Sequence, residues 1–378
     1  MARVAVAAPS PFPTYLQMTE RAPLRVWIVL RALGLLATLG VLVALFVDAP
    51  TGLTLFWGVV VPLLPLVFFL APGFWRNVCP MATLNQAPRV LGFSRALTLP
   101  KWFREYGYVV GVLLFLIIVP ARRVVFDDNG PALALLIIAS LGAAFVGGVV
   151  LKGKSGWCST ACPLLPVQRL YGQTPFLTVR NAHCRPCVGC VKNCYDFNPR
   201  VAYLADIFDA DTHRSGYRKF FAAAFPGLIL AFYTVASPPA ISVVEMYVRF
   251  ASIVLLSIGS FFVLEVFLRV TANKITALYA AAAFNLYYWF ALPPLAALAG
   301  DALGVTAPSW LAWAVQTVLL ALTAVWVART YQKETPFVQQ AVAPKPARVA
   351  SGESLARLRA TPAAAPAAPP PVPQRSAP

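Results

Sequence analysis

The chain has 378 residues, of which 59% are hydrophobic and 12% are charged, and its mean hydropathy is +0.70. A soluble globular protein carries about 25% charged residues, so this composition excludes one. The formal net charge is +17. The basic residues lie between apolar runs, which is the positive-inside pattern of a membrane protein and excludes a nucleic-acid partner as the explanation. We therefore expect an all-α integral membrane helical bundle surrounded by membrane lipid.

The first 24 residues contain four prolines and no apolar core. They do not resemble a cleavable signal peptide, so we expect residues 1–24 to form a cytoplasmic N-terminal segment.

Eight apolar runs are long enough to cross a bilayer as helices. The run that begins near residue 107 is short alone, but it reaches the required length if its helix starts near Trp102. The eight predicted spans are 25–47, 52–71, 102–120, 131–151, 219–237, 247–269, 275–298 and 308–329.

Charge between the spans predicts their orientation. Basic residues collect before the first span and in every second connection, including the long segment 152–218, while the other connections are neutral or acidic apart from Arg122 and Arg123. By the positive-inside rule, both termini face the cytoplasm and the chain is a multi-pass protein of the cytoplasmic (inner) membrane.

Four of the seven cysteines stand in the spacing C-x2-C-x2-C-x3-C, at Cys184, Cys187, Cys190 and Cys194. This is the spacing of the iron–sulfur ferredoxin run. Gly189 lets the backbone approach a cluster closely. Structural zinc is the alternative, because it also uses four thiolates, but zinc ribbons separate two C-x2-C pairs by a longer spacer.

Residues around this run add detail to the iron–sulfur prediction. Arg185 and Lys192 would offset the negative charge of a thiolate-ligated cluster. Bacterial ferredoxins have proline after the fourth cysteine, and this chain has Tyr195.

The other three cysteines lie in two Cys-Pro turns. The segment 73–80 follows the second span and contains Cys79, and the segment 156–163 follows the fourth span and contains Cys158 and Cys162. Both turns continue into an amphipathic stretch, which indicates a repeated half-bundle. Buried small residues would also explain such cysteines, but their place beside the ferredoxin run predicts that they are ligands.

Spans with C-x3-C-P turns followed by a cytoplasmic ferredoxin run resemble the polyferredoxin-like membrane proteins of the NapH, NosR and CcoG group, over about residues 25–200. The resemblance implies two [4Fe-4S] clusters held jointly by the turns and the run. The implied ligand sets are Cys184, Cys187, Cys190 and Cys162 for one cluster, and Cys158, Cys194 and Cys79 for the other.

The chain departs from this pattern at Trp75, where the first turn should have a cysteine. Seven thiolates leave a second cluster one cysteine ligand short. Its fourth iron is then without a protein ligand, or is held by a substitute such as His183 or Asp196, or is absent, which gives a [3Fe-4S] cluster. The remaining alternative is a single cluster, which the four cysteines of the run could close by themselves.

The predicted spans and the cysteine-rich segment divide the chain into 1–24, a four-span half with a Cys-Pro turn at 25–151, a cytoplasmic ferredoxin-type iron–sulfur insert at 152–218, and a second four-span half at 219–330. The Ala/Pro-rich tail 341–378 is expected to be disordered. Among polar residues, Glu265 and Arg269 are spaced to pair along one helix, and Asp206 is expected to be solvated.

These features predict a function. The chain has two histidines, His183 and His213, and neither lies in a span, so we expect no haem. We expect a membrane-bound electron carrier that passes electrons between a quinone or membrane partner and a reductase, and a subunit more than a stand-alone catalyst. The alternatives are a maturation factor that reduces a metal ion for a respiratory enzyme, and a zinc-stabilised membrane scaffold.

Overall fold

The computed structural model describes residues 15–208, 214–306 and 308–342. These residues form helices and turns with no β-strand, and an isolated bridge joins Leu97 to Leu151. The chain divides into two compact units, Met1–Glu334 and Thr335–Pro378, and the features below belong to the first. The predicted tail lies outside the described residues, except for its first two positions. The prediction of a helical bundle is confirmed.

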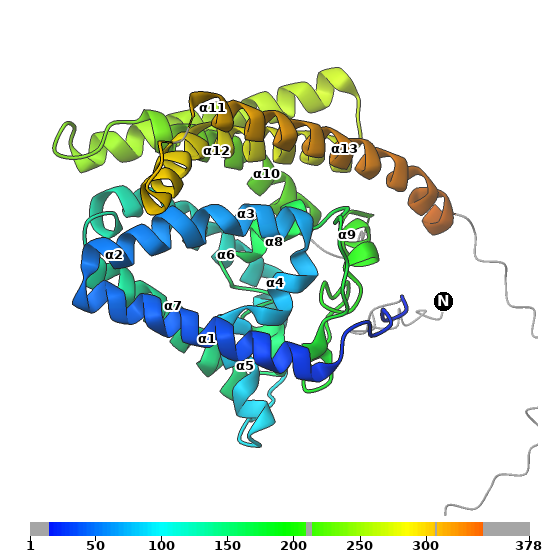
Figure 1. The fold of residues 1–378 in the computed structure, drawn as a ribbon. Helices are drawn as coiled ribbons and strands as arrows, with labels where there is room; N and C mark the ends of the chain where they lie inside the picture. Colours follow the sequence, from blue (N-terminus) through cyan, green and yellow to red (C-terminus); the bar gives the residue numbers. More distant parts are fainter. Residues whose placement is uncertain (1–14, 209–213, 307, 343–378) are drawn as a thin grey trace, which may run out of the picture. The chain divides into compact units, whose positions relative to one another are not determined.

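The elements follow the apolar runs of the sequence, and Figure 1 shows them in chain order. They are α1 (Leu24–Val47), α2 (Ala49–Leu53), η1 (Thr54–Val60), α3 (Val61–Leu70), α4 (Pro72–Val78), α5 (Pro80–Val90), α6 (Lys101–Ala121), η2 (Arg122–Phe126), α7 (Gly130–Val150), η3 (Gly153–Gly156), α8 (Leu165–Tyr171), η4 (Ala182–Cys184), α9 (Pro199–Phe208), α10 (Arg214–Thr234), α11 (Val243–Leu268), α12 (Ala272–Leu303) and α13 (Ser309–Val342).

Seven helices in the described part of the chain are long and apolar enough to cross a membrane. They coincide with seven of the eight predicted spans, so a multi-pass membrane protein is confirmed at this level. The seven are Leu24–Val47, Ala49–Leu70, Lys101–Phe126, Gly130–Val150, Val243–Leu268, Ala272–Leu303 and Trp310–Glu334.

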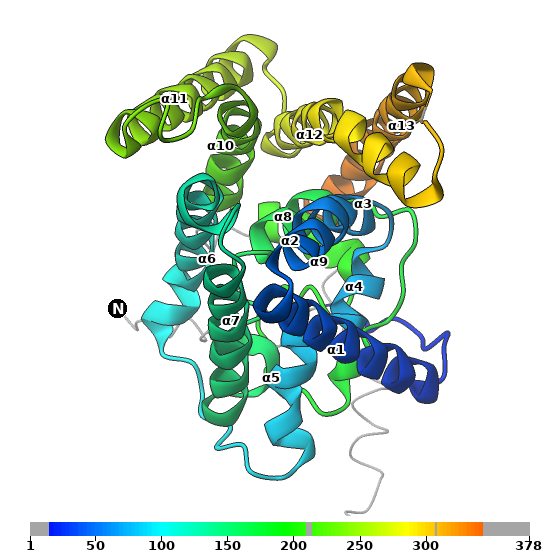
Figure 2. The same ribbon diagram turned by 60° about the vertical axis from the view of Figure 1, so that its left-hand side comes forward.

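The eighth predicted span, 219–237, is helix α10, which is not among these seven. Arg218 and Lys219 lie near its start and lower its hydropathy. Its apolar residues are buried by protein, because α10 packs against α6, α11 and α12. Figures 1 and 2 both show α10 beside α11. The crossing of the membrane by α10 therefore remains a prediction.

Helix α8 lies at the centre of the packing. All seven of its residues are buried, and it contacts α3, α6, α10 and α12. Phe69 of α3 and Phe284 of α12 pack against its Tyr171, with ring centroids 6.3 and 5.5 Å away. A short helix that is buried along its whole length, by apolar contacts and by the polar contacts of Arg169 and Gln168, holds the turn before it, which carries Cys158 and Cys162, in a fixed place.

The two Cys-Pro turns fold as the sequence predicted. Cys79 is the single residue between α4 and α5, in an extended conformation (φ −53°, ψ 125°), and Pro80 opens α5. Proline suits this position because its missing N–H has no partner in a first helical turn. The amphipathic stretches after the turns are helices α5 and α8.

Two expectations about polar residues are wrong. Glu265 pairs with Lys219 of α10 at 2.6 Å and not with Arg269, which ends α11 in a left-handed conformation. Asp206 is buried and ion-paired with Arg169 of α8, where a solvated residue was expected. In both cases a neighbouring helix supplies a partner that the local sequence does not reveal.

Candidate metal centre

The structure separates the seven free cysteines into two groups. The first, which we call the run group, contains the four cysteines of the ferredoxin spacing. They line one small cavity of about 100 Å³ together with Lys154, Asn181 and Asp196. The fold therefore brings the thiols of the C-x2-C-x2-C-x3-C motif to a common space, as the motif predicts.

The backbone of the preceding loop closes on the run group. The Lys154 N–H donates to Cys187 Sγ at 3.3 Å. A Cβ on Gly153 would lie 2.4 Å from that sulfur, and Gly153 has a positive φ of 50°. Gly189 is equally restricted, because its Cβ would lie 2.0 Å from the Lys152 carbonyl oxygen. Glycine is required at both positions by close backbone approach.

The second group, which we call the turn group, contains Cys79, Cys158 and Cys162. Cys79 and Cys158 pack together with Ala82, enclosed by Trp75, Met81 and Trp157. Cys79 is also close enough to Cys162 to raise the pKa of that thiol. The repeated Cys-Pro turns, which are far apart in the sequence, thus meet in space.

This grouping differs from the ligand sets implied by the family resemblance. Cys162 lies with the turn group, whereas the resemblance pairs it with the run. Cys194 lies with the run, next to Cys184 and Cys187, whereas the resemblance gives it to the other cluster. The four cysteines of the run lie around one cavity, which is the arrangement that a single cluster closed by the run would need.

A buried charge network lies between the two groups. Asp196 forms a two-point ion pair with Arg76 and a second ion pair with Lys154 at 3.3 Å, and it accepts from Asn181 Nδ2 at 2.8 Å. Arg76 also donates to Gln168 Oε1 at 2.8 Å and lies over the ring of Tyr195. The sequence analysis did not predict buried cations at this position.

The charges decide whether Asp196 can be a ligand. Burial alone would raise the pKa of its carboxyl, but attraction to Arg76 and Lys154 outweighs burial and holds the pKa well below its usual range. Its oxygens are committed to these cations and to Asn181, and its neighbours among the cysteines belong to the run group. Asp196 is therefore a partner of the cations and does not supply the missing ligand of the turn group.

His183 does not contact the thiols through any described interaction. It is buried, which lowers the pKa of its imidazole, so the ring is neutral. Its Nε2 has no hydrogen-bond partner among the described residues. Its backbone positions the run, because the His183 carbonyl accepts from the Cys187 N–H at 2.9 Å. His213 lies outside the described residues.

Burial keeps the thiols protonated in the absence of a metal. It raises the pKa of Cys162 and of Cys194 to about 12, and it raises those of Cys79, Cys158 and Cys184. The positive charge of Lys154 opposes this rise in pKa at Cys79, Cys158 and Cys184. Only a bound cation would convert such thiols into thiolates at neutral pH.

The arrangement of the donor side chains was compared with that of a single-ion site and of a cluster site. Within the described ranges, no three His, Cys, Asp or Glu side chains are arranged to hold a single metal ion. A single zinc ion draws its thiolates to about 2.3 Å from one point, whereas a cluster spreads its ligands over several irons. The run group has four thiols around one cavity, a backbone N–H on one sulfur and two buried cations nearby. These features fit an iron–sulfur cluster.

The sequence predicted compensating charge at Arg185 and Lys192, and the structure shows two further, buried cations near the thiols. Arg185 is exposed and pairs with Glu20 at 3.1 Å, so it does not lie among the buried charges. Arg76 and Lys154 hold that position instead. Their positions in the sequence could have indicated this role: Arg76 lies within the first Cys-Pro turn segment, and Lys154 lies just before the second.

No family model, curated protein or solved structure matches this chain. The resemblance to the polyferredoxin-like proteins therefore depends on the spacing of the cysteines and stays a prediction.

Proposed function

We propose that the chain is a membrane-bound iron–sulfur electron-transfer protein and that the run group holds a [4Fe-4S] cluster. The observation that supports this most directly is the cavity lined by all four cysteines of the ferredoxin spacing. This spacing is that of a ferredoxin run, whereas zinc ribbons separate two C-x2-C pairs by a longer spacer.

The residues around the run group have distinct parts in this proposal. Cys184, Cys187, Cys190 and Cys194 are thiolate ligands. The Lys154 N–H donates to the Cys187 sulfur, and hydrogen bonds to sulfur raise the reduction potential of a cluster. The buried cations of Arg76 and Lys154 stabilise the added electron. The cluster supplies one-electron transfer when it is bound.

The turn group offers three thiols for a second cluster. Trp75 stands where the repeat has Cys158, so no fourth thiol is present. A three-iron cluster, or a four-iron cluster with one open position, is the form that three cysteines accommodate. Such a cluster beside the run group would extend the electron path toward the apolar helices.

The seven apolar helices favour an electron-transfer partner that is dissolved in the lipid bilayer. We place the protein in the cytoplasmic membrane with both termini cytoplasmic, with α10 as the eighth span. Electrons then pass between a quinone or a membrane partner and a reductase on the cytoplasmic face. The chain acts as a carrier subunit and not as a catalyst by itself.

Metal analysis of anaerobically purified protein tests the proposal. We expect about four irons and four sulfides per chain for one cluster, and more of both for two, with an EPR signal on reduction. Cys187→Ser should lose most of the broad visible absorption, whereas Val188→Ala, in the same loop, should keep it. Iron-free protein, or one zinc per chain, would refute the proposal.

A further inference from the structure

An exposed surface that combines apolar and basic side chains lies in the connection between α5 and α6 and on the first turns of α6. It is formed by residues 93–106, and we call it the boundary patch. Phe93, Leu97, Trp102 and Tyr106 belong to it, and each is at least 48% exposed. Large apolar side chains that are exposed together mark a contact surface.

The boundary patch lies where two apolar helices end. The helix Lys101–Phe126, which is long enough to cross a membrane, begins within the patch, and α7 ends beside it. The Arg95 N–H donates to the Val149 carbonyl at 2.7 Å, and the Leu97 N–H donates to the Val150 carbonyl at 2.9 Å. Figure 2 shows the connection passing beneath the end of α7. Because spanning helices end at the surface of the bilayer, the patch lies at that surface.

Further contacts hold the boundary patch against the end of α7. The Ser94 hydroxyl donates to the Gly148 carbonyl at 2.8 Å, and the Leu97 carbonyl accepts from the Lys152 N–H at 2.9 Å. Leu99 is buried between the exposed residues. The exposed side chains therefore project from a segment whose backbone is fixed on the helical bundle.

Basic side chains lie among the apolar ones. Arg95, Lys101 and Arg104 are exposed, and Glu105 is the one acidic residue of the boundary patch. None of the three basic residues forms an ion pair with another described residue, whereas the exposed Arg249 pairs with a glutamate of its own helix. Positive charge in the patch therefore exceeds negative charge and is not neutralised by the described part of the protein.

The start of α6 has the residue pattern of a membrane interface. Trp102 and Tyr106 are four residues apart, so their rings lie on the same side of the helix. Such rings are enriched at the interface, where one part of the ring meets lipid and the polar part meets water. Lys101 and Arg104 are on the same two turns, and their long side chains can extend to the head groups.

We propose that the boundary patch binds anionic phospholipid. Phe93, Leu97 and Trp102 contact the acyl chains next to the head groups, and the three basic residues contact the lipid phosphate. Each basic residue near an anionic membrane surface adds an attraction that neutral lipid does not provide. An acidic protein fits less well, because the apolar side chains lie at the level of the bilayer surface. The proposal requires no metal and is independent of the proposed function.

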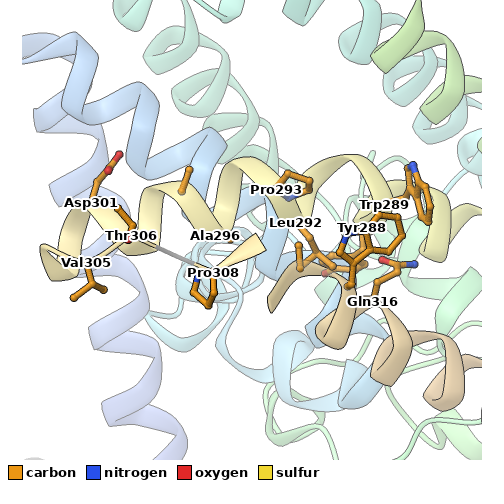
Figure 3. Close-up of a pocket in the computed structure, with 13 residues that line it drawn as sticks. Tyr288, Trp289, Leu292, Pro293, Ala296, Asp301, Val305, Thr306, Pro308 and Gln316 are labelled. Atoms are coloured by element: carbon orange, nitrogen blue, oxygen red, sulfur yellow. The ribbon is translucent and has the colours of Figure 1, made fainter. Parts of the chain in front are cut away.

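The pocket between α12 and α13 provides a comparison surface of opposite charge. Its volume is about 540 Å³, and Trp289 and Trp313 are among its mostly apolar lining residues. Asp301 is the one charged residue of this lining within the described residues, and Figure 3 shows it at the opposite end from Trp289. An acyl chain fits this lining, but a carboxylate disfavours an anionic head group.

Native mass spectrometry of the full-length protein in neutral detergent tests the proposal. Dioleoyl phosphatidylglycerol is the anionic probe, and dioleoyl phosphatidylcholine is the neutral one. A variant that combines Arg95→Gln, Lys101→Gln and Arg104→Gln should bind phosphatidylglycerol more than about tenfold more weakly. Its binding of phosphatidylcholine should change by less than about twofold. Thermal unfolding should be unaltered, because all three side chains are exposed.

The matched control removes the same charge elsewhere. Arg21, Arg25 and Arg269 are exposed and lie beside other apolar helices. A variant with glutamine at all three should bind phosphatidylglycerol within about threefold of the unaltered protein. An equal loss in both triple variants would overturn the proposal, since total charge would then decide the binding. Equal affinity of the unaltered protein for the two lipids would also overturn it.

Photo-cross-linking locates the bound lipid. Diazirine derivatives of the two lipids are cross-linked in nanodiscs, and the labelled peptides are mapped by mass spectrometry. We expect the ratio of phosphatidylglycerol to phosphatidylcholine labelling to be at least about fivefold higher at residues 93–106 than at residues 288–316. Equal ratios at the two places, or no labelling of 93–106, would overturn the proposal.

Discussion

At the scale of single residues, the site is organised by charge. One carboxylate, Asp196, lies between two buried cations, Arg76 and Lys154. Removing one partner of a buried ion pair leaves an uncompensated charge, which costs more than the pair contributes when intact. The network therefore depends on Asp196.

Asp196→Asn should lower the free energy of unfolding by about 3–5 kcal/mol, because it leaves Arg76 and Lys154 without their carboxylate. Thermal unfolding in detergent measures this. The control is Arg249→Gln, which breaks an ion pair with Glu245 whose side chains are 56% and 45% exposed, and it should change stability by less than about 1 kcal/mol. Equal effects of the two variants would contradict a buried network.

The thiols give a prediction about pH. Burial raises the pKa of Cys162 and of Cys194 to about 12, and only the thiolate reacts with iodoacetamide. In metal-free folded protein, their alkylation rate should rise about tenfold per pH unit from pH 8 to beyond pH 10. In the unfolded chain it should level off near the ordinary thiol pKa of about 8.5. Quantitative mass spectrometry follows each cysteine, and a plateau near pH 9 in folded protein would contradict the prediction.

At the scale of elements, the helix pair α5 and α7 positions Cys79. The two helices are in close contact, and Asn85 of α5 donates to the Ala144 carbonyl of α7 at 2.7 Å. A Cβ on Gly148 would lie 1.9 Å from the Asn85 carbonyl oxygen. Only glycine allows this approach, so Gly148 fixes how α5 and the cysteine at its start lie on α7.

Gly148→Ala should destabilise the protein by about 2 kcal/mol or more, because the methyl group meets rigid backbone. It should also reduce iron retention by displacing Cys79. Gly142→Ala lies on the same helix with no atom within 4 Å of the added Cβ, so it should be neutral or slightly stabilising. Thermal unfolding and iron content are measured for both variants. Equal stability of the two would contradict the close contact of α5 with α7 at Gly148.

The sequence predicted elements better than contacts. Apolar runs located seven spanning helices because a bilayer-length run has few alternatives. The cysteine spacing predicted that the four thiols of the run lie together, and they line one cavity, whereas the ligand sets implied by the resemblance grouped Cys162 and Cys194 differently. The positions of Arg76, Lys154 and Asp206 were not predictable, because a buried ion pair has the same sequence appearance as solvated charge. Gly153 was missed because its constraint comes from Cys187, far along the chain.

At the scale of the whole molecule, topology depends on α10. With α10 as a span, the predicted orientation has both termini on the cytoplasmic face. Without it, the seven apolar helices would place the termini on opposite faces. The contacts of α10 with α6, α11 and α12 place it inside the helical bundle, which is why we keep it as a span in the proposal.

Labelling of intact cells with a membrane-impermeant maleimide distinguishes the two topologies. Ala240 lies in the connection between α10 and α11 and is exposed, so Ala240→Cys should react from outside if α10 crosses. Val90→Cys, at the exposed end of α5, should react only after the cells are permeabilised. Protection of Ala240→Cys in intact cells would show that α10 does not cross.

The turn group unites parts of the chain that are synthesised at different times. Cys79 precedes α6 and α7, and its neighbours Cys158 and Cys162 follow them. During biogenesis, Cys79 therefore waits for a whole helical hairpin to be translated and inserted before its partners emerge from the ribosome. Under the proposed function, metal loading of this group therefore follows the insertion of α6 and α7, and nascent chains that end before Cys162 leave Cys79 without its partners.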